Sequence, residues 1–173
     1  YQIIQRDSNN TAWVEIQVTT SLPVSKSGLL EYRLDKNKTW EKLSGEWKNQ
    51  NHLSRLKMPA GGWYGLEVRD SRTPDHRSQV VQFGVGEVFV VAGQSNSGNY
   101  GEVKQSTQTG LVSAYDFENK KWQLAVDPQP GAGGRGGSIM PILGDGLAKH
   151  GRFCFDTTYT PAQNTDAINH GGV

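Results

Sequence analysis

Residues 86–96 read Gly-Glu-Val-Phe-Val-Val-Ala-Gly-Gln-Ser-Asn, and this stretch decides the fold expected for the second half of the chain. Residues 88–92 form an unbroken apolar run, which is typical of a strand covered on both faces in a parallel sheet flanked by helices. The run stops at Gly93, and hydrogen-bonding side chains follow at Gln94, Ser95 and Asn96. Because ligands of open α/β sheets usually bind at the carboxyl ends of the strands, we expect a crevice there.

Ser95 is the candidate nucleophile of this crevice. A serine at such a turn can present its hydroxyl and its own backbone N–H to the same space, which provides a nucleophile and an oxyanion donor together. Gly93, Gln94 and Asn96 are the adjoining candidates for holding the oxyanion or the substrate. The alternative is a solvated or capping serine, because Gly, Ser and Asn are also ordinary loop residues. Ser97 stands where the nucleophile elbow of α/β-hydrolases has Gly, so that motif is absent.

The same residues resemble the first block of the sialate O-acetylesterases and related carbohydrate acetylesterases of the SGNH hydrolase superfamily. The match is continuous over residues 86–96 and continues more loosely through Trp122, Asp127-Pro128 and residues 137–141. In those enzymes a strand runs into Gly-Gln-Ser-Asn, and the Ser is the nucleophile. The resemblance implies that role for Ser95, in a secreted or periplasmic bacterial protein that acts on acetylated carbohydrates.

Composition excludes several other classes of function. The chain has 173 residues with 18 basic and 17 acidic side chains, so no nucleic acid or anionic membrane surface is expected as a partner. No apolar run approaches the roughly 20 residues that span a bilayer, and residues 1–4 lack the pattern of a signal peptide. The single cysteine, Cys154, excludes an internal disulfide and is expected to be a buried thiol. His52 and His76 have no second ligand at metal spacing, and we expect no metal or other cofactor.

The chain up to residue 85 is expected to be all-β. Apolar residues alternate with polar ones in several short segments, which is the period of half-buried strands. These segments are residues 12–18, 30–34, 56–58, 64–68 and 81–85. Short strands separated by Gly, Pro, Asn and Ser predict an antiparallel, immunoglobulin-like sandwich.

Four tryptophans of this part have two possible uses. Their faces suit stacking against sugars, but packing in the core or at sheet edges is the usual role of such residues. They are Trp13, Trp40, Trp47 and Trp63.

The residues after Gly93 predict a small hairpin, a long loop and a helix. Residues 111–117 and the segment from Trp122 read as the two strands of the hairpin. Residues 131–137 are rich in Gly, and we expect a flexible loop over the Ser95 crevice. Ser138 is a candidate N-cap of the following helix and a weaker candidate for contact with the substrate.

The helix is expected over residues 139–150, and a second parallel strand after it. Its residues Ile142, Leu143, Leu147 and Ala148 have the spacing of a face that lies on a sheet. Residues 152–159 contain Phe153-Cys154-Phe155, which suits the next strand of a right-handed crossover.

The end of the chain departs from the family pattern. SGNH hydrolases carry further β-α units and an Asp-x-x-His pair in which His activates the Ser and Asp orients the His. Asp166 and His170 are the candidates here, but they are spaced by one residue too many. The chain therefore resembles a truncated esterase, which the remainder of the domain or another chain would complete.

The sequence as a whole predicts an α/β protein with an all-β N-terminal part. We expect a sandwich domain over residues 1–85 and the N-terminal portion of a three-layer α/β/α SGNH-hydrolase-like domain over residues 86–173. The expected function is hydrolysis of O-acetyl groups from sugars through Ser95 and an acyl-enzyme. The alternative is a carbohydrate-binding or inactive form that lacks the acid–base pair.

Overall fold

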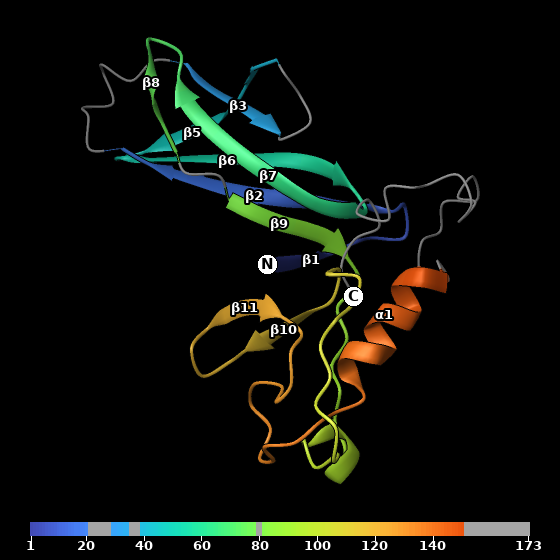
Figure 1. The fold of residues 1–173 in the computed structure, drawn as a ribbon. Coiled ribbons are helices and arrows are strands. Elements are labelled where there is room, and N and C mark those ends of the chain that lie inside the picture. The colour runs from blue at the N-terminus through green and yellow to red at the C-terminus, as the bar shows by residue number, and fades with distance from the viewer. Residues whose placement is uncertain (21–28, 35–38, 79–80, 151–173) are drawn as a thin grey trace. The chain divides into compact units, whose positions relative to one another are not determined.

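The computed structural model describes residues 1–20, 29–34, 39–78 and 81–150 of the chain (Figure 1). This part is mostly β-sheet, arranged in several sheets, with one short α-helix. It divides into two compact units that interleave in sequence. The first unit comprises Tyr1–Ala12, Pro59–Trp63 and Phe83–Val173, and the second comprises Trp13–Met58 and Tyr64–Gln82. These units are defined by contacts, which group residues 1–12 and 59–63 with those after residue 83. The division into two domains at residue 85 stays a prediction.

The second unit contains two sheets. The strands that lie wholly or mostly in it are β2 (Thr11–Thr19), β3 (Leu30–Leu34), β4 (Glu41–Lys42), β5 (Gly45–Lys48), β6 (Asn51–Pro59), β7 (Gly61–Asp70) and β8 (Thr73–Arg77). In one sheet β3 lies between β7 and β4, with β8 also pairing with β7; the other has the order β2-β6-β5. β3 is antiparallel to both neighbours, and Tyr32 is opposite Val68 on β7 and Glu41 on β4.

Alternation of buried and exposed residues is clear along β2 and most of β6, and it contributes to the core of the second unit. On β2, Val14 and Ile16 are buried, whereas the intervening Trp13 is 53% exposed. The period of two places apolar side chains on one face and polar ones on the other. The buried apolar side chains of this unit are Val14, Ile16, Leu30, Leu43, Met58, Leu66 and Val68.

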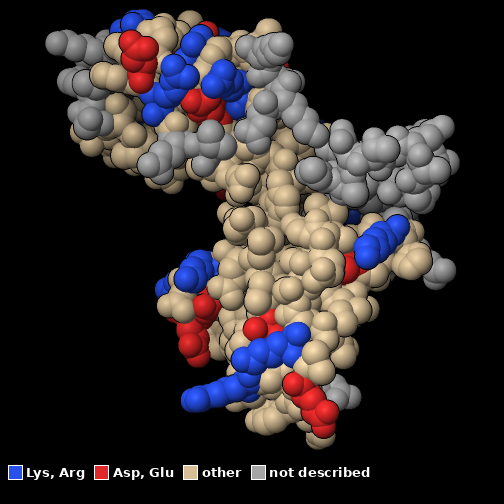
Figure 2. Space-filling view, in the orientation of Figure 1, with Lys and Arg blue, Asp and Glu red and all other residues tan. Residues whose placement is uncertain are grey.

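Paired charges occupy part of the sheet that contains β3 and β7, and Figure 2 shows charged side chains of both signs gathered there. The register sets Glu31 opposite Arg69 and Arg33 opposite Glu67. The closest N–O distances are 2.8 Å in the first pair and 2.6 Å in the second. Partly exposed pairs of this kind contribute up to about 1 kcal/mol each, so their main effect is on strand register.

The first unit begins with a parallel strand pair that the sequence did not predict. β1 (Gln2–Gln5) runs parallel to β9 (Val81–Gly86), with Ile3 opposite Gly84. This pairing corrects the prediction of a purely antiparallel sheet. An ion pair between Arg6 and Glu87 continues the association just beyond the two strands.

A hairpin and the helix follow in the first unit. β10 (Ser113–Asp116) and β11 (Lys121–Leu124) are antiparallel, which confirms the predicted hairpin. Its turn is held by the Asp116 carboxylate, which accepts the backbone N–H groups of Glu118 and Asn119. The helix α1 (Met140–His150) lies where the sequence places it. In the described residues, no helix has the length and apolar character needed to cross a bilayer.

The predicted buried strand over residues 88–92 is wrong for the described structure. This segment has no assigned secondary structure, and Val90 is 94% exposed. An apolar run becomes a buried strand only when neighbouring strands pair with it and other layers cover it. None of the sheets in the described part of the chain includes this segment, and the expected three-layer α/β/α arrangement is not shown. The second expected strand, residues 152–159, lies outside the described residues.

The buried face of α1 also differs from the prediction. Ile142 and Leu143 were expected to face a sheet, but they are 56% and 47% exposed. The buried residues are Pro141, Gly144 and Asp145. Gly144 leaves no room for a side chain, because a Cβ there would lie 2.4 Å from Cγ1 of Val112. The helix therefore packs through its smallest residue against the segment before β10.

Candidate active-site loop

Ser95 opens a short turn that follows the apolar run. Residues Ser95–Ser97 form a single 3-10 turn, named η2, in which the Gly98 N–H donates to the Ser95 carbonyl at 3.0 Å. Ser97 donates its N–H and its hydroxyl to the Gln94 carbonyl, at 3.1 and 2.9 Å. Gly93 fits this turn closely, since a Cβ there would lie 2.8 Å from the Ser97 hydroxyl oxygen. The serine two positions after Ser95 thus closes the turn.

The Ser95 side chain is exposed and its hydroxyl has no hydrogen bond to any described residue. Its backbone N–H also has no partner within the described part of the chain. The Gln94 side chain is exposed as well, so it is accessible to a ligand. With respect to the described residues, the hydroxyl and the N–H of Ser95 are both available, and acyl transfer uses these two groups of a nucleophilic serine.

Asn99 anchors the loop that carries Ser95. Its side chain is 0% exposed, and its amide donates to the Gln129 carbonyl and accepts the Gln129 N–H, both at 2.8 Å. Asn99 has φ of 61°, a left-handed conformation that Asn adopts more readily than other residues with a side chain. The Asn99 side chain thus satisfies both backbone groups of Gln129, and it connects the segment after the Ser95 turn to a residue that is distant in sequence.

The glycine-rich loop over residues 131–137 packs against the same segment. The N–H groups of Gly134 and Gly136 donate to the carbonyls of Gly98 and Asn99, at 2.8 and 2.7 Å. A Cβ on either glycine would lie 2.2 Å from a backbone oxygen of the Asn99–Gly101 segment. These glycines therefore serve close backbone packing. The loop was predicted to be flexible, whereas the structure gives it regular hydrogen bonds.

Asp127 joins the two segments a second time, and Ser138 is one of its partners. The Asp127 carboxylate accepts the Ser138 hydroxyl at 2.7 Å, the Ser138 N–H at 2.8 Å, and the Gln105 N–H and the Gln129 side-chain amide, both at 2.9 Å. Burial raises the pKa of this carboxyl, but the hydrogen bonds outweigh burial and hold the pKa below its usual value. Asp127 is thus a fixed carboxylate inside the first unit.

Ser138 also marks the start of the helix, as expected for a capping residue. Its hydroxyl oxygen accepts the Met140 N–H at 3.3 Å while its hydrogen is directed to Asp127. The side chain is buried, and the hydroxyl is already committed as a donor. Ser138 therefore fixes the beginning of α1 in the described structure.

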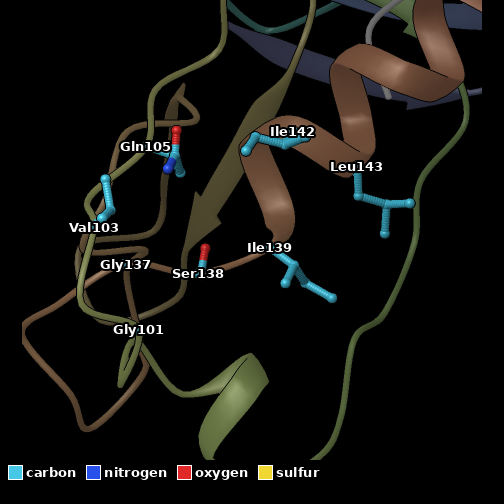
Figure 3. A pocket seen from close by; sticks show the side chains of 8 residues that line it. All are labelled: Gly101, Val103, Gln105, Gly137, Ser138, Ile139, Ile142 and Leu143. Carbon is cyan, nitrogen blue, oxygen red and sulfur yellow. The ribbon is translucent and has the colours of Figure 1, made fainter.

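A pocket of about 430 Å³ lies beside the start of α1 (Figure 3). Its lining is mostly apolar and does not include Ser95. The lining residues are Gly101, Val103, Gln105, Gly137, Ser138, Ile139, Ile142 and Leu143. Of the predicted site residues that the structure describes, Ser138 lines this pocket, whereas Gly93, Gln94 and Ser95 do not.

The predicted general base and its orienting carboxylate belong to the end of the chain. Asp166 and His170 lie outside the described residues, and the side chain of Asn96 is likewise not described. His52 is buried against the Ser54 hydroxyl in the second unit, and His150 is exposed at the end of α1. No described histidine is hydrogen-bonded to Ser95.

The tryptophans divide between packing and exposure. The Trp63 indole N–H donates to the Gly110 carbonyl at 2.8 Å. Trp47 packs edge-on against the His52 ring, with 4.9 Å between the ring centres. Trp40 is stacked against two guanidinium groups, those of Arg33 and Arg69. Trp13 alone among the predicted four is largely exposed, with the Arg55 guanidinium 5.4 Å from its ring centre.

Residue patterns did not reveal the three polar anchors of this unit, Asn99, Asp127 and Asp145. Asp145 is buried in the middle of α1, where it accepts hydrogen bonds from Thr107, Gln108 and Thr109. The available signal was an acidic residue on the buried side of a helix opposite a Thr-Gln-Thr segment. Such a pairing is visible only when the partner segment is known.

Comparison with known protein families, with curated proteins and with solved structures finds no match. The described residues also contain no cluster of His, Cys, Asp and Glu that would hold a metal ion. The resemblance to acetylesterases is therefore one of sequence, carried mainly by the motif at residues 86–96.

Proposed function

We propose that this chain belongs to a carbohydrate esterase that removes O-acetyl groups from sugars, with Ser95 as its nucleophile. The observation that carries the proposal is the exposed Ser95 hydroxyl, which has no hydrogen bond to any described residue and stands on a loop fixed by Asn99. The resemblance of the surrounding motif to the sialate O-acetylesterases supports the substrate class.

The proposed reaction has two steps. Ser95 Oγ attacks the acetyl carbonyl carbon while a general base accepts the hydroxyl proton, and the sugar hydroxyl leaves with a proton. Water then attacks the acetyl-serine ester and releases acetate. The Ser95 N–H, assisted by Gln94 or Asn96, stabilises the negative charge on the carbonyl oxygen. The proposed base is His170, oriented by Asp166 as in other triads.

The domain proposal follows from the same resemblance. Residues 86–173 would form the N-terminal portion of an SGNH-like α/β/α domain, and residues 1–85 an immunoglobulin-like sandwich beside it. The remaining strands would come from the rest of the domain or from an associated chain. A secreted or periplasmic location would suit an enzyme that acts on extracellular glycans.

The test combines turnover with covalent labelling of the nucleophile. The chain and its Ser95→Ala and Ser97→Ala variants would be assayed for acetate release from glucose pentaacetate and treated with a fluorophosphonate. We expect Ser95→Ala to lower the rate by roughly a thousandfold or more. The fluorophosphonate should be found on Ser95 by peptide mass spectrometry. Ser97→Ala, in the same turn, should retain labelling at Ser95.

Unchanged acetate release in the Ser95→Ala variant would remove Ser95 from the mechanism. Labelling of Ser95 without turnover would separate an activated nucleophile from a complete catalytic site. Absence of both labelling and turnover, in a chain with the expected circular dichroism spectrum, would contradict esterase activity of this chain.

A second candidate function is carbohydrate binding through the second unit, which the exposure of Trp13 favours. An exposed indole face beside a guanidinium offers stacking and hydrogen bonding to a sugar ring. Affinity electrophoresis in gels that contain acetylated xylan tests this idea. Trp13→Ala should abolish retardation, and Trp13→Phe should keep part of it; equal mobility of all three proteins would exclude this role for Trp13.

A further inference from the structure

The second unit holds a titratable side chain in its interior, His52 on β6. The residue is only 4% exposed, and it shares the buried face of β6 with Ser54 and Met58. Among the described residues, the ring has one hydrogen bond, between Nδ1 and the Ser54 hydroxyl at 2.9 Å. Trp47 is opposite His52 on β5 and packs against its ring. The reaction proposed for Ser95 makes no use of this histidine.

The surroundings of His52 do not compensate a positive charge on its ring. In the described part of the chain, no carboxylate forms an ion pair with it. Alternation along β5, β6 and β2 directs their charged side chains to the exposed face, and these are Glu46, Lys48, Arg55, Lys57 and Glu15. In the sheet of β3 and β7, the charged side chains pair with one another, Glu31 with Arg69 and Glu67 with Arg33. Burial lowers the pKa of His52 below its usual value, because the charged ring loses its hydration.

Strand β5 is the weakest cover of this histidine. It has four residues, of which three are exposed, and in the described structure it pairs with β6 only. A Cβ at Gly45 would lie 2.7 Å from Cε1 of His52, so the backbone of β5 lies directly against the ring. Short segments with few buried contacts open at a lower free energy than the unit to which they belong. Displacement of β5 is therefore the easiest route by which water can reach the ring.

We propose that protonation of His52 releases β5 from β6, so that the second unit opens at this edge in acid. In the opened form the ring is hydrated, and its pKa returns toward the ordinary value of about 6.5. The closed form is therefore fully favoured above about pH 6.5 and loses stability as pH falls through the lower pKa of the closed form.

The consequence of release is an unpaired strand edge. The backbone groups of β6 that pair with β5 would become available, and such an edge can accept a strand from another chain. The proposal concerns the second unit and does not depend on the esterase reaction. Its failure would leave the chemistry of Ser95 open, and failure of the esterase assay would leave the opening of β5 open.

Hydrogen exchange in the full chain tests the proposal. Protection would be measured at about pH 7.5 and about pH 5, on either side of the usual histidine pKa, relative to an unstructured peptide at the same pH. In residues 45–48 of the unaltered chain, protection should be about threefold lower, or lower still, at the acidic pH. Protection within β7 should stay nearly constant, because the rest of the unit remains folded.

Two variants separate His52 from other effects of acid. In His52→Asn, the side-chain amide can still bond to the Ser54 hydroxyl, but it does not titrate. His76→Asn is the matched control, because His76 is an exposed histidine of the same unit, on β8. The acid-induced loss of protection should disappear in His52→Asn and persist in His76→Asn. Equal loss in all three proteins, or equal loss in β5 and β7, would overturn the proposal.

A titration followed by NMR needs only the unaltered chain, so it does not depend on the folding of a variant. The ring protons of His52, identified by their contacts with Trp47, should titrate below the usual value of about 6.5. The amide signals of Glu46 and Lys48 should change over the same pH range. Titration of the ring at or above the usual value would contradict the proposal, and so would β5 amide signals that stay constant while the ring titrates.

Discussion

Substitution of Asn99 should loosen the loop that carries Ser95. The fully buried Asn99 side chain makes hydrogen bonds of 2.8 Å to both the N–H and the carbonyl of Gln129. Asn99→Gly removes both bonds and leaves two backbone groups of Gln129 without partners. A buried group left unsatisfied costs about 1–3 kcal/mol, so we expect a loss of about 3 kcal/mol in the free energy of unfolding of the first unit.

Comparison with Asn99→Ala separates hydrogen bonding from backbone strain. Asn99 has φ of 61°, a conformation in which a Cβ costs about 1–2 kcal/mol and which glycine adopts freely. The greater freedom of glycine in the unfolded chain offsets roughly half of this difference. Asn99→Ala should therefore be less stable than Asn99→Gly by about 1 kcal/mol.

Hydrogen exchange with mass spectrometry is the appropriate assay, because it resolves the two units. Peptides that cover residues 94–101 and 126–138 should exchange faster in both variants. Peptides from β3 and β6 report on the second unit and serve as the internal control. A loss of less than about 0.5 kcal/mol in Asn99→Gly, the range of ordinary surface substitutions, would refute the assigned role of Asn99.

Two further predictions test the packing around this loop. Gly137→Ala would place a methyl group 1.8 Å from the Val103 carbonyl oxygen and should destabilise the first unit by more than about 2 kcal/mol. At Gly146 a new methyl group would meet no atom within 4 Å, so Gly146→Ala should stabilise α1 by about 0.5–1 kcal/mol. Equal effects of the two substitutions in thermal unfolding would contradict this packing. The pKa of Asp127 is lower in the folded state than in the unfolded state. The ionised carboxylate therefore stabilises the folded chain at pH values above the unfolded pKa of about 3.9, and this contribution is lost as pH falls through the folded pKa. Melting temperatures measured from about pH 6 down to about pH 3 should therefore fall less steeply in Asp127→Asn than in the unaltered chain, and parallel curves would exclude Asp127 as a main source of acid sensitivity.

Local periodicity accounts for the elements that were predicted correctly. Strand β2 is visible in sequence because it has one buried face, which imposes alternation on its own residues. Strands β3 and β7 lie where the sequence predicts strands, although burial along them does not alternate. The hairpin of β10 and β11 and the helix α1 are likewise local, with their strands, turn or period contained in short segments. Their positions followed from neighbouring residues alone.

Strand β1 shows where local reasoning stops. Gln2–Gln5 is too short for a reliable pattern, and its partner β9 is far away in the sequence. The apolar run at residues 88–92 shows the reverse case, since its composition indicates burial that the described residues do not provide. Burial depends on the partners of a segment, and composition states only a tendency to be buried.

The sequence by itself determined the alternating strands, the hairpin, the helix and the candidate nucleophile, because each depends on residue types within one short segment. Only the tertiary structure decided that Ser95 is exposed, that Asn99 and Asp127 hold its loop to residues 129–138, and that Gly144 packs against Val112. These features depend on groups that are distant in sequence and meet only after folding. The role of a buried polar side chain depends on its hydrogen-bond partners, and the periodicity of the sequence does not indicate which residues those partners are.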